Sequence, residues 1–286
     1  GGYDKETHKR DLVNSKTEFT NKHGNNILDV DCDEPGCSDM DITFDGIGFV
    51  NAKGLTGKNN AAFYSYCGEG DVNLTIKNCF FTGNSHILTA DDTNYAETQG
   101  AALLIFSLNT VVIENTVFTD NEAVRAPAIT IAATKATINN CRFEGNNATE
   151  NAGVVYVNSG AKPTFNDCVF TGNKATENAG VVYVDGGAKP TFNDCVFTGN
   201  TALKWGMIHH QSGTTVLNNC KFIDNSISSE WDGGAIATRY GSSGSITVNG
   251  GEFTGNYAGW GAAFYQAKEG KSNVADLYVN DVLIKN

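Results

Sequence analysis

Apolar and small residues recur along this chain in fixed columns whose period is that of a supersecondary unit. Successive Phe of the repeated segment Phe-x-x-Asn are 37, 25, 27, 27, 25 and 31 residues apart. Because the pattern persists while the spacing changes, it predicts a constant coil that carries loops of different length. The segments are Phe81–Asn84, Phe118–Asn121, Phe143–Asn146, Phe170–Asn173, Phe197–Asn200, Phe222–Asn225 and Phe253–Asn256, and Leu283–Asn286 looks like an eighth.

The residues before each Phe predict how one coil is bent. An apolar residue lies five positions before Phe, and a small residue, usually Cys, lies two positions before it. These positions cannot all face inward on a straight strand, where side chains alternate. A bend three positions before Phe corrects the phase, and most coils have there Asn or Asp, which tolerate the left-handed conformation. We therefore predict an all-β, single-stranded parallel β-helix (β-solenoid) of about nine coils over residues 25–286, with residues 1–24 as an N-terminal arm or cap.

Two stretches of 23 residues are almost identical. Residues 151–173 and 178–200 differ only at Asn158/Asp185 and Ser159/Gly186. Two copies cannot both be a unique active site, so the duplication is interpreted as added length.

The paired motifs resemble those of chlamydial polymorphic membrane proteins and of adhesin-like β-helix proteins. The match consists of the seven Phe-x-x-Asn segments and one Gly-Gly-Ala-Ile, at Gly233–Ile236, within roughly residues 60–286. The resemblance implies a passenger domain exposed at the cell surface, used in adhesion or as surface structure. Repeats of this kind specify a fold better than a function.

The net charge and two glycosylation motifs indicate which partners and which location are compatible with the chain. The net charge of −12 argues against nucleic acid and anionic membranes as partners, and no apolar stretch approaches 18 residues. Two sequons, at Asn73 and Asn147, agree with an extracellular or cell-surface location but are weak evidence alone.

The eight cysteines fall into two groups. Cys141, Cys168, Cys195 and Cys220 share one inward column, where stacked Cβ atoms would be about 4.8 Å apart, farther than a disulfide favours. We interpret them as small buried residues. The alternative is that some of them form disulfides between adjacent turns. Cys32 and Cys37 bracket a turn and are predicted to form a disulfide, and Cys67 could pair with Cys79.

An acidic cluster near the start is the candidate metal site. Carboxylate oxygens are the ligands that Ca²⁺ prefers, and alternate residues of a strand share a face. The candidate ligands for a possible Ca²⁺ ion are Asp29, Asp31, Asp33, Asp39 and Asp41, with a solvated acidic surface as the alternative.

Three tryptophans are candidates for glycan binding. Trp205, Trp231 and Trp260 each precede the small-residue strand of successive coils, and an aromatic strip there would hold sugar rings or another subunit. The alternative is packing at a corner. His209 and His210 are adjacent on a strand, so they should face opposite sides and not share a metal.

The sequence favours a non-catalytic extracellular structural or adhesive β-solenoid without an organic cofactor. Its expected partners are other copies of the same chain, joined end to end into a filament or surface layer, or cell-surface glycans. The alternatives are a carbohydrate-binding β-helix and a polysaccharide-active lyase or glycoside hydrolase. The pair Asp91 and Asp92 could serve a hydrolase, but the further catalytic motifs of such enzymes are missing nearby.

Overall fold

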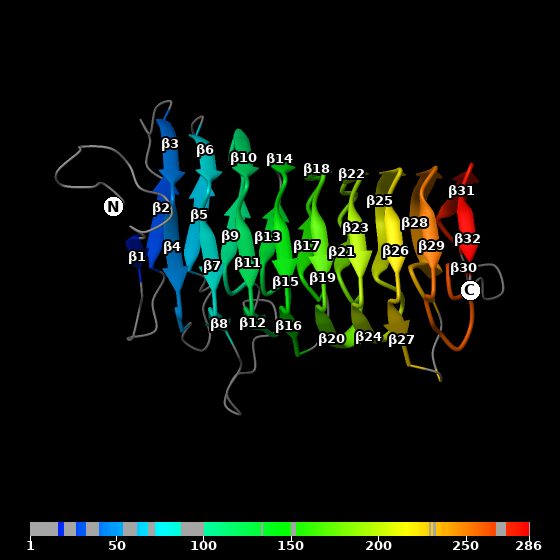
Figure 1. The fold of residues 1–286 in the computed structure, drawn as a ribbon. Helices are drawn as coiled ribbons and strands as arrows, with labels where there is room; N and C mark the ends of the chain where they lie inside the picture. The colour runs from blue at the N-terminus through cyan, green and yellow to red at the C-terminus, as the bar shows by residue number, and fades with distance from the viewer. Residues whose placement is uncertain are drawn as a thin grey trace.

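A computed structural model of the chain describes residues 17–19, 27–32, 40–53, 62–67, 72–86, 100–132, 134–149, 153–228, 230, 233–266 and 273–285. These residues form a parallel β-helix, in which each turn lies beside the next along one axis (Figure 1). The predicted fold class is thereby confirmed. None of the described residues forms a helix long and apolar enough to cross a membrane.

Each turn runs through up to four faces, named here in chain order. The first face contains β2 (Leu28–Cys32), β5 (Phe63–Cys67), β9 (Leu103–Phe106), β13 (Ile129–Ala132), β17 (Val155–Asn158), β21 (Val182–Val184), the start of β25 (Ile208–Asn218), the start of β28 (Ile236–Asn249) and β30 (Phe264–Gln266). The second face contains β3 (Met40–Asp45), β6 (Val72–Lys77), β10 (Thr110–Glu114), β14 (Lys135–Asn139), β18 (Lys162–Asn166), β22 (Thr191–Asn193), the ends of β25 and β28, and β31 (Asp276–Asn280). Because β25 and β28 span both faces, the two faces form one continuous sheet.

The third face follows the left-handed corner and carries the Phe column. It contains β1 (Thr17–Phe19), β4 (Ile47–Val50), β7 (Phe80–Thr82), β11 (Val117–Thr119), β15 (Arg142–Glu144), β19 (Val169–Thr171), β23 (Val196–Thr198), β26 (Lys221–Ile223), β29 (Glu252–Thr254) and β32 (Leu283–Lys285). The fourth face is short, with β8 (Ser85–His86), β12 (Glu122–Ala123), β16 (Asn147–Ala148), β20 (Lys174–Asn178), β24 (Thr201–Lys204) and β27 (Ser226–Ile227).

The number of turns differs slightly from the expected nine. Six successive turns, beginning at β5, β9, β13, β17, β21 and β25, have a strand on all four faces. The turns at either end have no named strand on the fourth face among the described residues, although single bridges at Lys53 and Tyr257 continue it. Within the segment that was predicted to be an arm or cap, β1 pairs with β4 and extends the third face.

The predicted corners are present at the positions that the repeat indicated. Asn78, Asn115, Asn140, Asp167, Asp194 and Asn219 have φ between 49° and 54°. This left-handed conformation turns the chain between the second and third faces, so the apolar residue before the corner and the Phe after it both point inward. One repeat assignment was wrong by a residue, because Ile284 and not Leu283 pairs with Phe253.

Stacked side chains fill the interior. The rings of Phe49, Phe81, Phe118, Phe143, Phe170, Phe197, Phe222 and Phe253 lie parallel, with centroids 4.5–5.0 Å apart. The spacing follows from the strand separation in a parallel sheet, which is about 4.8 Å. Each of these rings is at most 1% exposed, so the column forms a continuous apolar core along the rod.

A buried asparagine column lies beside the Phe column. Asn84, Asn121, Asn146, Asn173, Asn200 and Asn225 each donate a hydrogen bond from Nδ2 to Oδ1 of the next member, which ends with Asn256, over 2.9–3.0 Å. Each Nδ2 also donates to the carbonyl oxygen of the Phe one turn earlier. These bonds satisfy amide groups that would be costly to bury alone, so the column sets the register between turns.

Candidate functional site

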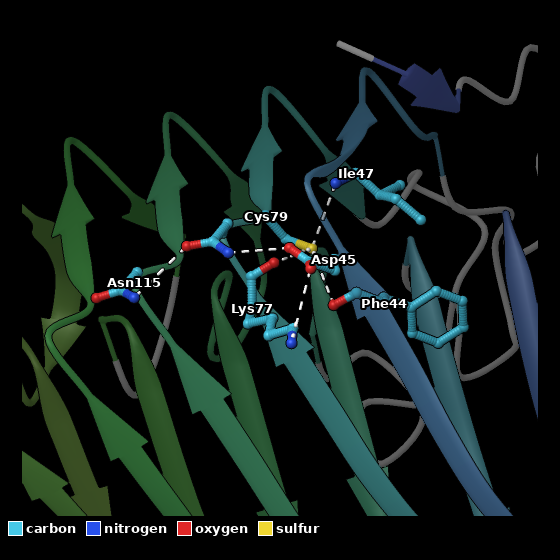
Figure 2. Close-up of polar contacts among 7 residues, drawn as sticks. Phe44, Asp45, Ile47, Lys77, Cys79 and Asn115 are labelled. Atoms are coloured by element: carbon cyan, nitrogen blue, oxygen red, sulfur yellow. Dashed lines mark hydrogen bonds and ion pairs between the residues drawn. The ribbon is translucent and has the colours of Figure 1, made fainter. Parts of the chain in front are cut away.

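The inward cysteines form a packing column, as predicted. Cys79, Cys141, Cys168, Cys195 and Cys220 are buried free thiols, and Thr116 occupies the same column. Because the thiol of Cys79 is free, the possible Cys67–Cys79 disulfide is not formed. Figure 2 shows Cys79, whose Sγ donates to the carbonyl oxygens of Lys77 and Phe44, at 3.2 Å and 3.7 Å. Burial raises the pKa of the Cys79 and Cys141 thiols, so both are poor nucleophiles at neutral pH. These thiols therefore contribute to the core.

The predicted disulfide falls largely outside the described residues. Cys37 is not among them, and neither are the side chains of Cys32 and Cys67. The strand register does show that the backbones of Cys32 and Cys67 are direct partners in β2 and β5. The Cys32–Cys37 pairing stays a prediction.

The acidic cluster is described only in part. Asp33 and Asp39 lie outside the described residues, and Asp29 and Asp31 are known only by their places in β2. Asp41 is exposed and accepts a hydrogen bond from Nδ2 of Asn73 at 2.9 Å. Within the described part of the chain, no three His, Cys, Asp or Glu side chains are grouped closely enough to hold a metal ion. The calcium site remains an expectation.

The sequon asparagines both use their side-chain amides. Asn73 donates to Asp41, and Nδ2 of Asn147 donates to Oε1 of Glu122 at 2.8 Å. Both are half-buried on the outer surface of the rod. The possible catalytic pair Asp91 and Asp92 lies outside the described residues.

The tryptophans have different surroundings where they are described. Trp205 is half-buried and its ring lies 4.9 Å from that of His209, with Nζ of Lys204 5.0 Å above it. Trp260 is 60% exposed, and Trp231 lies outside the described residues. Whether the three form one strip is left as a prediction.

His209 and His210 point to opposite sides of β25. His209 aligns with the outward Tyr183, and the two rings meet edge to face at 4.9 Å. His210 points inward, with Nδ1 2.9 Å from Oγ1 of Thr215 and Nε2 3.1 Å from the carbonyl oxygen of Ser243. Burial lowers the pKa of His210. The adjacent histidines therefore do not converge on one ligand.

A partly covered aromatic cluster lies on the outer side of the first face. The rings of Tyr156 and Tyr183 lie 5.6 Å apart at an angle of 60°, and Tyr183 meets His209 edge to face. Burial raises the pKa of both tyrosines to about 12, with a smaller contribution from Asp185. Arg125 acts in the opposite direction on both. Both phenols are neutral at physiological pH, as a tyrosine with the ordinary pKa of 10.0 already is, so they offer hydroxyl groups rather than charge.

The outer side of the second face carries polar residues in three parallel rows. Strands β14, β18 and β22 pair in register, which brings Thr137, Thr164 and Thr191 into one row. The amides of Asn139, Asn166 and Asn193 form a second row, in which each Nδ2 donates to Oδ1 of the preceding member at 2.7–2.8 Å. Asn218, Asn249 and Asn280 continue this row through later turns.

The third row consists of lysines. Lys135 is the register partner of Lys162, and the backbone hydrogen bond from Lys189 to Ala161 places Lys189 in the next turn of the same row. All three are exposed. Each lies eight residues before the Phe of its own coil, a fixed offset that sequence reasoning could have found. Packing does not restrict this outward position, so the lysines do not stand out from ordinary surface residues in the sequence.

A surface groove borders the lysine row. It has a volume of about 410 Å³ and is lined by Leu108, Asn109, Thr134, Lys135, Ser159, Gly160 and Lys162. These residues come from the corners between the first and second faces in three successive turns. The groove therefore crosses strands along the axis of the rod, so an elongated partner can lie across several turns at once.

Comparison with known proteins agrees with this architecture. No curated protein and no solved structure was found to match the chain. The family model of the right-handed β-helix region matches residues 15–197, which is more than half of the chain. The chain therefore belongs to the right-handed β-helix family.

Proposed function

We propose that this chain is a non-catalytic structural or adhesive β-solenoid that acts outside the cell or at its surface. The observation that carries the proposal is the repetition of one outer surface over successive turns. The rows of Lys135, Lys162 and Lys189, of Thr, and of hydrogen-bonded Asn repeat with the strand spacing. A catalytic centre is a single constellation, whereas a repeated surface is suited to a repetitive partner or to a scaffold.

The interior supports the same role. The Phe and Asn columns run without interruption from the turn of Phe81 to that of Phe253. Such columns make the side faces stiff, because every turn is tied to its neighbours by ring stacking and buried amide bonds. The duplicated stretch lengthens this stiff element without changing its cross-section.

The resemblance to adhesin-like repeats and the two sequons favour the surface location. Antibody labelling of intact cells that produce the native protein tests it. We expect labelling before permeabilisation, and labelling only after permeabilisation would contradict the proposed location.

A deletion of one turn tests the scaffold role. Residues 152–178 span one 27-residue period between the two copies, so their removal joins equivalent positions. We expect the shortened chain to keep the β-rich circular dichroism spectrum of the full chain and to unfold in one cooperative transition, because the joined turns have the same cross-section. A chain that fails to fold would contradict the scaffold role. Release of new sugar ends from any polysaccharide incubated with the full chain would contradict the non-catalytic assignment.

A further inference from the structure

The lysine row is unusual for a chain with a net charge of −12. Three like charges are stacked on neighbouring strands at the spacing of a parallel sheet, about 4.8 Å, where they repel one another. None of Lys135, Lys162 and Lys189 has an ion-pair partner among the described residues; the ion pairs found there involve other residues. The three ammonium groups are therefore available to an external anion.

The nearest acidic residue in the chain order is already engaged. Asp185 precedes Lys189 in the corner of its turn, and its Oδ1 accepts hydrogen bonds from Ser212 Oγ at 2.9 Å and Gly186 N at 2.7 Å. The amide row beside the lysines ends near Glu114, whose Oε1 accepts from Asn139 at 3.2 Å. Both carboxylates accept hydrogen bonds from neutral donors and keep their negative charge, but neither is paired with a lysine of the row. The row is therefore flanked by hydroxyl and amide groups, with one carboxylate towards each end.

The geometry points to an elongated anion rather than a small one. The groove at Lys135 and Lys162 extends over three turns, and its lining is partly apolar through Leu108. A chain of sugars that carries an anionic group on successive rings brings charges at a spacing comparable to that between strands. The hydroxyl groups between those charges find partners in Thr137 and Asn139 and in the same residues of the next turns.

We propose that this corner groove, together with the second face over β14, β18 and β22, binds an extended acidic polysaccharide with a carboxylate or sulfate on successive sugars. Lys135, Lys162 and Lys189 contact the anionic groups, and the Thr and Asn rows contact sugar hydroxyls. The inference rests on the proposed adhesive function and names the chemistry of its partner.

Nucleic acid fits this surface less well. A duplex carries one phosphate per strand for about every 3.4 Å of helix axis, and the rest of this acidic chain repels such a dense polyanion. A phosphate backbone also offers no row of hydroxyl donors to the ladder of Asn139, Asn166 and Asn193. Duplex DNA is therefore an informative competitor in the test.

The experiment measures binding of fluorescently labelled polygalacturonate and dextran sulfate by the full chain, with dextran and duplex DNA as comparisons. The test variant replaces Lys135, Lys162 and Lys189 by Gln. The control variant replaces the exposed residues Lys53, Lys174 and Lys221 by Gln. It removes as many positive charges as the test variant does, but from the third and fourth faces.

We expect binding of at least one acidic polysaccharide and none of dextran. The test variant should bind about tenfold to a hundredfold more weakly, since three exposed ion pairs are lost, and the control should stay within about threefold. Circular dichroism confirms folding of both variants, and binding by the native chain should weaken as salt rises. Binding of polygalacturonate alone would indicate a carboxylate ligand, and binding of dextran sulfate alone would indicate a sulfate ligand.

Several outcomes would overturn the inference: binding of neither acidic polymer, equal binding of dextran, tighter binding of DNA, or equal losses in both variants. If the chain adheres to cells but binds no polyanion, this inference is wrong and the proposed adhesive function still holds. If the chain cleaves a polymer that it binds through the lysine row, the non-catalytic function is wrong and the proposed binding site still holds.

Discussion

Nδ2 of Asn146 donates a hydrogen bond to Oδ1 of Asn173 at 3.0 Å, and both side chains are fully buried. The two residues are 27 positions apart and belong to successive turns. The same Nδ2 donates to the carbonyl oxygen of Phe118. One amide therefore joins three consecutive turns, which explains why Asn recurs at this position in every turn from Asn84 to Asn256.

Replacement of Asn146 by Ala should destabilise the fold strongly. Oδ1 of Asn146 accepts from both the backbone N and Nδ2 of Asn121, at 3.1 Å and 2.9 Å, and both donors are buried. Each donor left without an acceptor costs about 1–3 kcal/mol, so we expect a loss of about 2–6 kcal/mol in the free energy of unfolding, measured in urea.

Asn166→Ala is the matched control for this variant. Asn166 belongs to the outer amide row and is half-buried, so water can replace its hydrogen bonds with Asn139 and Asn193. We expect a loss of about 0.5–1 kcal/mol. Equal losses in the two variants would show that the buried column has no special role.

The cysteine column should accept threonine. Thr116 occupies the same column, and its Oγ1 donates to the carbonyl oxygen of Glu114 at 2.9 Å, as the Cys168 thiol donates to that of Asn166 at 3.4 Å. We therefore expect Cys168→Thr to change the stability by less than about 1.5 kcal/mol, because the hydroxyl finds the same acceptor. Cys168→Phe, which overfills the site, should lose more.

Thiol labelling should distinguish folded from unfolded protein. All five buried thiols are at most 2% exposed, which shields them from reagents, and burial also raises the pKa of Cys79 and Cys141. We therefore expect the five to react with a maleimide only in denaturant. Rapid labelling of these five thiols in the native chain, located by peptide mapping, would contradict their placement.

Stability should fall as the pH drops below neutral, in part through His210. Its pKa in the folded chain lies below the ordinary value of 6.5 because of burial, and the hydrogen bond to the Ser243 carbonyl and the charge of Asp185 oppose this shift. The unfolded state therefore binds the proton first, so the contribution of neutral His210 is complete above about pH 6.5 and is lost as pH falls toward the lower, folded pKa. His210→Gln keeps a polar side chain and should flatten the slope of the unfolding free energy between pH 7 and 5. An unchanged slope would assign the pH dependence to other groups.

The duplicated turns should differ in their tolerance of Ala. A Cβ atom on Gly153 would lie 2.1 Å from the carbonyl oxygen of Gly180, which the backbone cannot relieve cheaply. The same atom on Gly180 would meet Sδ of Met207 at 2.7 Å, where a flexible side chain can move. We expect Gly153→Ala to cost about 1–3 kcal/mol more than Gly180→Ala in urea unfolding. Equal losses of unfolding free energy in the two variants would contradict the different contacts of Gly153 and Gly180.

The sequence by itself determined the shape of one turn. The left-handed corners, the inward Phe and the small residue before it are local requirements of the chain, so they recur in every copy and could be predicted from Asn140, Cys141 and Phe143 alone. The columns of Phe, Asn and Cys follow, because identical coils stack at one strand spacing. The duplicated stretch could be interpreted as length for the same reason.

The tertiary structure decided what the turns place beside one another. The assignment of Leu283 to the Phe column was wrong because register is set by pairing with β29, where Ile284 lies opposite Phe253. The groove beside Lys135, Lys162 and Lys189 depends on neighbours in successive turns. Each Lys lies eight residues before its Phe, but no packing constraint restricts that outward position, so the offset alone does not indicate a shared surface. Inward positions are restricted by volume and hydrogen bonding, and therefore leave a pattern, whereas outward positions gain meaning only through the neighbours that stacking gives them.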